Sequence, residues 1–103
     1  MSVLLEYTMF PTDKGESVSE FVSKIIENIK NSNFQYKLTA MGTIVETQTV
    51  SEALKIVEES YEILKPFSNR VYASIKLDIR KNHKNRLVEK IKSIEKNIGS
   101  VEK

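Results

Sequence analysis

Apolar and polar side chains alternate along several segments of the chain, and this period of two is typical of β-strands. The clearest case is residues 70–80, where five apolar residues alternate with polar, charged or aromatic ones. Residues 2–10 and 36–41 alternate in the same way, and residues 43–47 are rich in the β-branched side chains that strands favour. Pro11 ends the first segment, because proline donates no hydrogen bond to a ladder. We therefore predict four strands.

Three further segments place apolar residues on one side of the helical period of 3.6 residues. The first two begin at Ser17 and Thr49, each followed three residues later by a glutamate, which is the spacing of a capping box. Pro66 marks the end of the second helix, and a third helix is expected over residues 85–97. The apolar stripes of these helices are Phe21, Val22, Ile25, Ile26 and Ile29; Ala53, Leu54, Val57, Tyr61 and Leu64; and Leu87, Val88, Ile91, Ile94 and Ile98.

The resulting order of elements is βαββαβ followed by a terminal helix, which is the split-βαβ or ferredoxin-like arrangement. We therefore predict an α+β fold with a four-stranded antiparallel sheet. Right-handed crossovers place both connecting helices on one face of that sheet. The apolar row of the last strand, from Val71 to Ile79, is expected beneath these helices. The other face then points toward solvent, a ligand or a second subunit.

Length and composition are those of one globular domain spanning residues 1–103. Apolar residues make up 40% of the chain and charged residues 29%. No apolar run reaches the ~18 residues that a membrane-spanning helix needs. The chain contains no cysteine, which excludes disulfides and thiolate metal sites, and its first residues lack the basic start of a signal peptide. We expect a cytoplasmic location and no membrane partner.

Basic residues are concentrated in one short run, residues 80–86. Such a run is either a solvated loop or a nucleic-acid contact. It contains no aromatic residue for stacking on bases, so a solvated loop is the simpler interpretation and a nucleic-acid partner is not expected. His83, the only histidine, lies in this run without the company that a metal site requires.

Strand alternation gathers a mixed set of side chains on the face away from the helices. The set comprises Glu6, Thr8, Ile44, Glu46, Tyr72, Ser74 and Lys76, with either Thr39 or Met41. Sites for small organic molecules pair apolar walls with a few directed polar groups in this way. Glu6 and Lys76 could instead pair with each other across strands. Glu46 is an isolated acid among β-branched residues, and we favour it as a ligand contact. Arg70 either binds an anion or partner, or caps the preceding helix.

Four stretches of the chain resemble the small thiamine-binding protein family, and together they extend over nearly the whole sequence. They are Val3–Pro11, Ser17–Val22, Met41–Glu46 and Arg70–Arg80. The Met-Gly-Thr-x-x-Glu and Arg-Val-Tyr pieces, in this order, are the most specific. The chain departs from the family pattern at Pro11–Gly15 and at Thr47, where the family usually has glycine, and both departures lie at the rim of the expected site.

This resemblance implies a homodimer or tetramer built through the sheets. It also implies binding of thiamine or its hydroxymethylpyrimidine precursor as a ligand, with no further cofactor and no catalysis. In that interpretation a carboxylate such as Glu46 accepts a charge-assisted hydrogen bond from the aminopyrimidine edge. An aromatic ring stacks on the ligand or attracts its thiazolium charge. The full set of expected ligand contacts is Glu46, Thr43, Thr8, Tyr72, Ser74, Glu6, Phe10 and Arg70. Side chains of an ideal strand alternate between its two faces, so Thr43 and Glu46 point to opposite faces. Thr43 therefore reaches the site only if the chain bulges or turns at Gly42.

Two other functions stay open beside this one. Ferredoxin-like sheets also bind RNA by stacking bases on aromatic side chains, but these strands lack the paired exposed aromatics and the Lys/Arg-Gly-Phe signature of that class. An enzyme is the least favoured interpretation, because no nucleophile–base pair or metal set can be assembled from the sequence. We therefore predict no catalytic residue and no metal ligand, with an RNA-binding or regulatory interaction module as the alternative.

Overall fold

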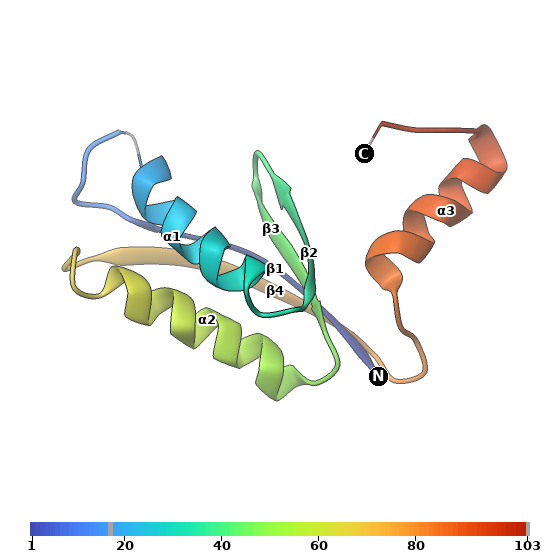
Figure 1. Ribbon diagram of the computed structural model, residues 1–103, viewed down its shortest axis with the longest axis horizontal. Helices are drawn as coiled ribbons and strands as arrows, with labels where there is room; N and C mark the ends of the chain where they lie inside the picture. Colours follow the sequence, from blue (N-terminus) through green and yellow to red (C-terminus); the bar gives the residue numbers. More distant parts are fainter. Residues whose placement is uncertain (17, 103) are drawn as a thin grey trace.

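The computed structural model describes residues 1–16 and 18–102, and its elements follow the predicted order (Figure 1). They are β1 (Ser2–Pro11), α1 (Ser19–Lys30), β2 (Gln35–Thr39), β3 (Gly42–Thr47), α2 (Val50–Leu64), β4 (Val71–Arg80) and α3 (Arg86–Ile98). The strands form a four-stranded sheet in the order β2-β3-β1-β4, and every neighbouring pair is antiparallel. The predicted ferredoxin-like α+β fold is confirmed.

The two crossover helices begin in different ways. α2 has the predicted capping box: Thr49 Oγ1 accepts a hydrogen bond from the Glu52 amide at 3.1 Å, and Glu52 Oε1 accepts one from the Thr49 amide at 2.9 Å. The predicted cap of α1, Ser17, lies outside the described residues. α1 begins at Ser19, after Val18, whose side chain makes no capping hydrogen bond.

α1 and α2 cover one face of the sheet, and the hydrophobic core lies between these helices and the strands (Figure 1). Its buried side chains are Val3, Leu5, Tyr7 and Met9 from β1, Val45 from β3, Ile25 and Ile29 from α1, and Ala53, Ile56 and Leu64 from α2. The buried Tyr7 hydroxyl keeps a partner in the Ser60 hydroxyl, 2.8 Å away. Burial raises the pKa of the Tyr7 phenol. The alternating residues of the central strand β1 therefore supply the largest part of the core.

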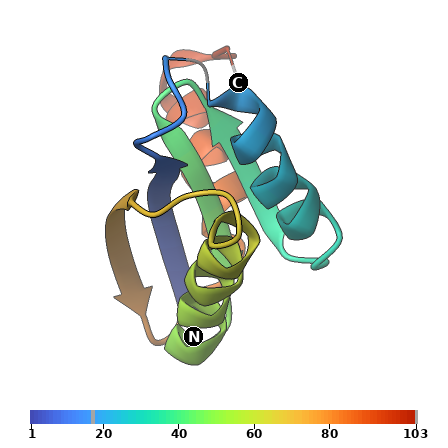
Figure 2. The same ribbon diagram turned by 90° about the vertical axis from the view of Figure 1, so that its left-hand side faces the viewer.

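β4 is an edge strand, and here one expectation from the sequence is wrong. Its apolar row does share the helix-side face with the core, because Leu77 lies opposite the buried Leu5. Among the elements that the structure describes, however, no helix lies in front of β4 (Figure 2). Ile75, Leu77 and Ile79 therefore remain 43%, 36% and 48% exposed. Strand alternation fixes which face a side chain occupies, but it does not fix how far the helix layer extends over the sheet.

α3 lies on the opposite side of the sheet from α1 and α2 and extends away from it (Figure 1). Arg86 is the buried residue of this helix. Leu87 and Ile91 are half-buried, whereas Ile94 and Ile98 are exposed, so one chain covers only part of the apolar stripe. None of the helices in the described ranges is long and apolar enough to cross a membrane.

Candidate functional site

We call the side of the sheet opposite α1 and α2 the open face. On this face the pairing of β1 with β4 brings together five of the eight predicted ligand contacts. They share the face because every second side chain of a strand points the same way. The cross-strand pairs, which we call the open-face cluster, are Glu6 with Lys76, Thr8 with Ser74, and Phe10 with Tyr72.

A hollow of about 210 Å³ lies within the open-face cluster. It is lined by Glu6, Tyr7, Thr8, Met41, Ser74 and Lys76. Lys76 Nζ lies 3.8 Å from Glu6 Oε1, and both side chains are largely exposed to solvent. An ion pair of this length and exposure contributes little stability. Glu6 is therefore a carboxylate that a ligand can reach at small cost.

Two aromatic rings stand at one end of the open-face cluster. The ring centroids of Phe10 and Tyr72 are 5.6 Å apart, and the ring planes are tilted by 39°. Tyr72 is 52% exposed, so its ring is accessible from the open face. This aromatic pair is not evident from the sequence, because Phe10 and Tyr72 lie far apart in the chain and the β1–β4 register brings them together.

Glu46 lies on the open face as predicted, but away from the open-face cluster and beneath the start of α3. Its carboxylate accepts hydrogen bonds from the Ser2 hydroxyl at 2.6 Å and from the Arg86 and Leu87 amides at 3.0 and 3.1 Å. Partial burial alone would raise the pKa of Glu46, but these hydrogen bonds outweigh it and the pKa lies below its ordinary value. Glu46 thus caps the N-terminus of α3.

Arg86 anchors the same end of α3, and the sequence analysis missed this role. Its guanidinium donates to Ser2 Oγ at 2.9 Å, to the Ser2 carbonyl at 2.8 Å and to Asp78 Oδ2 at 3.0 Å. It also donates to the Asp78 carbonyl. The sequence placed Arg86 in a basic run that suggested a solvated loop. Strand alternation gave one sign of this contact, because it places Ser2, Glu46 and Asp78 on the same face of the sheet, the open face.

The Met-Gly-Thr motif holds the β2–β3 hairpin against β1. A Cβ atom on Gly42 would lie 2.9 Å from Thr8 Oγ1 and 3.1 Å from the Tyr7 carbonyl oxygen, so only glycine permits this approach. Thr8 Oγ1 in turn donates a hydrogen bond to the Met41 carbonyl at 2.9 Å. Thr8 is therefore fixed in position by the hairpin.

Thr43 points to the helix side of the sheet, as parity requires, and is buried. It lines a second hollow of about 180 Å³ between α1 and the hairpin, together with Tyr7, Thr8, Met9, Phe10, Val18, Val22, Ile25, Ile26, Leu38, Thr39, Ala40, Met41 and Gly42. Tyr7, Thr8 and Met41 border both hollows. Thr43 therefore lies near the open-face cluster but on the other side of the sheet.

Arg70 lies just before β4, and its backbone rather than its side chain makes the local contacts. Its carbonyl accepts hydrogen bonds from the Thr12 amide at 3.0 Å and from the Ser68 hydroxyl at 2.7 Å. The residue is exposed, and the C-cap position of α2 is Lys65. Arg70 therefore does not cap α2.

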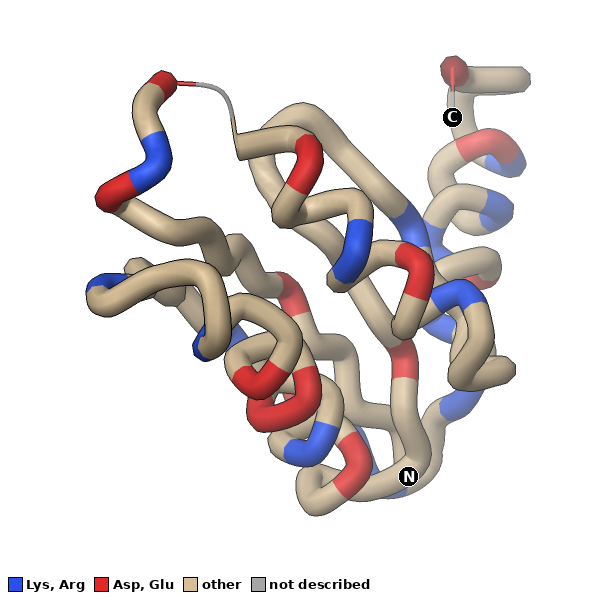
Figure 3. Tube along the Cα trace, turned by 60° about the vertical axis from the view of Figure 1, so that its left-hand side comes forward, with Lys and Arg blue, Asp and Glu red and all other residues tan. Residues whose placement is uncertain are grey.

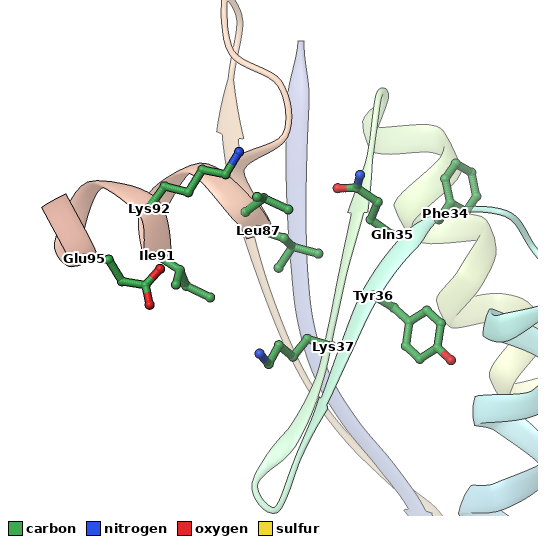
Figure 4. Close-up of a pocket in the computed structure, with 9 residues that line it drawn as sticks. Phe34, Gln35, Tyr36, Lys37, Leu87, Ile91, Lys92 and Glu95 are labelled. Carbon is green, nitrogen blue, oxygen red and sulfur yellow. The ribbon is translucent and has the colours of Figure 1, made fainter. Parts of the chain in front are cut away.

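A larger hollow is an open groove of about 550 Å³ between β2 and α3. Leu87, Val88, Ile91, Lys92 and Glu95 line it from α3, and Gln35 and Lys37 line it from β2, with Phe34 and Tyr36 at its border. Gln35 and Lys37 point toward the α3 side, whereas Phe34 and Tyr36 point toward α1 and α2 (Figure 4). The predicted ligand contacts do not line this groove.

Charged residues of both signs are interleaved over the molecule, including α3 (Figure 3). Within the described residues, no group of three or more His, Cys, Asp and Glu side chains could hold a metal ion. The basic run before α3 is exposed apart from Arg86, which its hydrogen bonds hold against the sheet. The polar and aromatic groups of the open-face cluster remain the candidate site.

Comparison with other proteins places these features in a family. Residues 5–95 match a family model described as thiamine-binding protein. UPF0045 protein MJ1052 of Methanocaldococcus jannaschii is 36% identical over 92 residues, which cover 89% of this chain and 91% of the relative. A UPF0045 protein of Methanothermobacter thermautotrophicus is 30% identical over 98 residues, which cover 93% of this chain and 99% of the relative.

Crystal structures show the same fold. That of MJ1052 has a TM-score of 0.80 at 35% identity and covers 90% of this chain and 95% of its own. A Thermotoga maritima structure has a TM-score of 0.77 at 20% identity and covers 91% of this chain and 99% of its own. That protein is provisionally named for thiamine biosynthesis or salvage, and at this identity the likeness concerns the fold alone.

Proposed function

Because the chain belongs to the thiamine-binding protein family, we propose that it binds thiamine or hydroxymethylpyrimidine on the open face without catalysis. The observation that supports this proposal most is the open-face cluster. It combines a carboxylate, two hydroxyls and two aromatic rings beside one hollow. Small-molecule sites typically pair a few directed polar groups with apolar walls in this way.

In this proposal Glu6 is the carboxylate that contacts the ligand. The three hydrogen bonds that Glu46 accepts from Ser2 and the start of α3 use most of its capacity. The Glu6 carboxylate is exposed, and the contact that it makes with Lys76 is long, at 3.8 Å. An aminopyrimidine edge can displace Lys76 and donate a charge-assisted hydrogen bond to Glu6.

The remaining members of the cluster supply neutral and aromatic contacts. The Ser74 hydroxyl lines the hollow, and Thr8, whose proton goes to the Met41 carbonyl, can still accept a hydrogen bond. The accessible Tyr72 ring, supported by Phe10, can stack on the pyrimidine or attract the thiazolium cation, an effect worth about 0.5–2 kcal/mol. Polar recognition and ring stacking then act on neighbouring parts of one ligand.

The size of the hollow supports a second subunit at the site. Its volume of about 210 Å³ is below the roughly 300–1,000 Å³ of a typical ligand pocket. We propose that a second copy packs across the open face and encloses the rest of the ligand. A homodimer or a dimer-of-dimers tetramer would satisfy this requirement.

Isothermal titration calorimetry with thiamine and with hydroxymethylpyrimidine tests the proposal. We expect binding by the unaltered protein and an affinity about tenfold or more lower in Glu6→Gln, because a charged hydrogen bond contributes about 1.5–3 kcal/mol. Glu62→Gln, on an exposed position of α2, is the matched control and should bind as the unaltered protein does.

Two results would count against this proposal. One is the absence of heat with either ligand. The other is equal affinity in Glu6→Gln combined with a large loss in Glu46→Gln, which would move the ligand to the start of α3. Mass spectrometry of the titrated sample should return the ligand unchanged, because the proposal includes no reaction.

RNA binding is a second candidate function, and the pair of Phe10 and Tyr72 favours it. Two aromatic rings on neighbouring strands of a ferredoxin-like sheet can stack on successive bases. Binding of single-stranded oligonucleotides that weakens steeply with salt and is lost in Tyr72→Ala would support this function. Retention of oligonucleotide binding in Tyr72→Ala would instead point to the basic run.

A further inference from the structure

A polar hollow of about 330 Å³ lies at the end of the sheet where β2 begins and β3 ends, beside the loop that leads into α3. No member of the open-face cluster lines it. Its volume lies within the roughly 300–1,000 Å³ of a typical ligand pocket. Four carboxamide side chains line this hollow, which we call the carboxamide hollow: Asn33, Gln35, Gln48 and Asn85. Both glutamines of the chain are therefore gathered in one place.

The four carboxamide groups make no hydrogen bond within the described part of the chain. Asn85 shows this most clearly. It occupies the N-cap position of α3, where an asparagine usually accepts a backbone amide, but its side chain makes no capping hydrogen bond. Glu46 accepts the Arg86 and Leu87 amides in its place. The Asn85 carboxamide is therefore left for another partner.

Asn33 and Asn85 also share an uncommon backbone conformation. Among the described residues other than glycine, these two have a positive φ, at 68° and 57°. Asparagine adopts the left-handed region more readily than most residues because its short side chain can hydrogen-bond locally. Neither side chain makes such a bond here. The fold instead brings both carboxamides, from the loop after α1 and the loop before α3, to the same hollow.

Charged groups of both signs complete the lining of the carboxamide hollow. Glu52 Oε1 accepts the Gln48 and Thr49 amides at 3.0 and 2.9 Å, whereas Oε2 accepts no hydrogen bond from the described residues. Glu46 borders the hollow too, but its carboxylate is already held by three hydrogen bonds. Lys84 is exposed and forms no ion pair within the described ranges. One spare carboxylate oxygen and one ammonium offset each other, which favours a neutral polar ligand over an ion.

We propose that the carboxamide hollow binds a neutral sugar. Each carboxamide places N–H donors beside a carbonyl acceptor, and each sugar hydroxyl both donates and accepts, so adjacent hydroxyls match these groups. A nucleobase fits less well, because bases are held by stacking on aromatic rings. Phe34 belongs to the lining, but its ring points toward α1 and α2, away from the side on which Gln35 lies (Figure 4). This site is separate from the open-face cluster and does not depend on thiamine.

The side-chain NH₂ signals of asparagine and glutamine in a nitrogen–proton correlation spectrum report on this site directly. We expect titration with D-ribose or D-glucose to shift the signals of the four carboxamides, while the signal of Asn97, on an exposed part of α3, stays in place. Gln35→Ala and Gln48→Ala should each weaken sugar binding about two- to tenfold, as the loss of one hydrogen bond does. Asn97→Ala is the matched control and should bind as the unaltered protein does.

The inference is overturned if neither sugar moves these signals, if the shifts lie elsewhere on the molecule, or if both glutamine variants bind with unaltered affinity. Shifts of the same signals with adenine and with neither sugar would also overturn it, in favour of a nucleobase. Both glutamines are exposed, so each variant should keep the far-ultraviolet circular dichroism of the unaltered protein. The titration contains no thiamine, so its result is independent of ligand binding at the open-face cluster.

Discussion

At the scale of single residues, the structure places the two predicted ligand contacts Glu46 and Glu6 in different surroundings. The sequence favours Glu46 as the ligand contact because it is an isolated acid among β-branched residues. Its carboxylate accepts hydrogen bonds from the Arg86 and Leu87 amides, which have no partner within the first turn of a helix. Strand alternation correctly predicts that Glu6 and Glu46 both lie on the open face of the sheet. It cannot predict that the loop after β4 returns α3 to Glu46, because nothing local in the sequence encodes that long-range contact.

Glu46→Ala should therefore act on stability and only weakly on ligand binding. Loss of the cap leaves two amide donors unsatisfied, and we expect the free energy of unfolding to fall by about 1–2 kcal/mol. Urea unfolding measures this change, and hydrogen exchange should show faster exchange in the first turn of α3. Unchanged stability together with lost thiamine binding would return Glu46 to the ligand site.

The lowered pKa of Glu46 gives this cap a definite pH dependence. A carboxylate whose folded pKa lies below its ordinary value of 4.5 stabilises the fold fully above that pH. The stabilisation is lost as the pH falls through the folded pKa. We therefore expect the stability difference between the unaltered protein and Glu46→Ala to shrink as the pH falls below 4.5. Chemical denaturation at several pH values tests this, and a difference that grows on acidification would contradict it.

At the scale of elements, local patterns predict most of what the structure contains. Alternation locates the four strands, the helical period locates the three helices, and the capping box at Thr49 is found from two residue types at one spacing. These features depend on neighbours in the sequence. The placement of α3 depends instead on Arg86 reaching Ser2 and Asp78 across the sheet. A basic run carries no local sign of such a contact.

Thr49→Ala tests how far α2 depends on its cap. The Thr49 side chain accepts the Glu52 amide in the capping box, and its removal should lower the free energy of unfolding by about 1 kcal/mol. Ser51→Ala, at an exposed position in the first turn of the same helix, is the matched control. Equal stability of both variants in thermal denaturation would show that tertiary packing alone fixes the start of α2.

At the scale of the whole molecule, one chain leaves three apolar or mixed surfaces unsatisfied. They are the open face, the edge of β4 with its apolar row, and the groove beside α3. The sequence predicts the first of these, because a sheet with helices on one side must expose the other. It misses the second, because the apolar row of β4 is expected beneath helices that do not reach it. A small domain buries a modest share of its surface alone, and we propose that association covers part of the rest.

Changes in backbone amide chemical shifts during a thiamine titration would show whether the ligand binds at the open-face cluster, as we propose. We expect the largest ligand-dependent shifts in a nitrogen–proton correlation spectrum at Glu6, Thr8, Ser74 and Lys76, with smaller shifts along α3. Shifts confined to the groove between β2 and α3, or no shifts up to saturating thiamine, would contradict it.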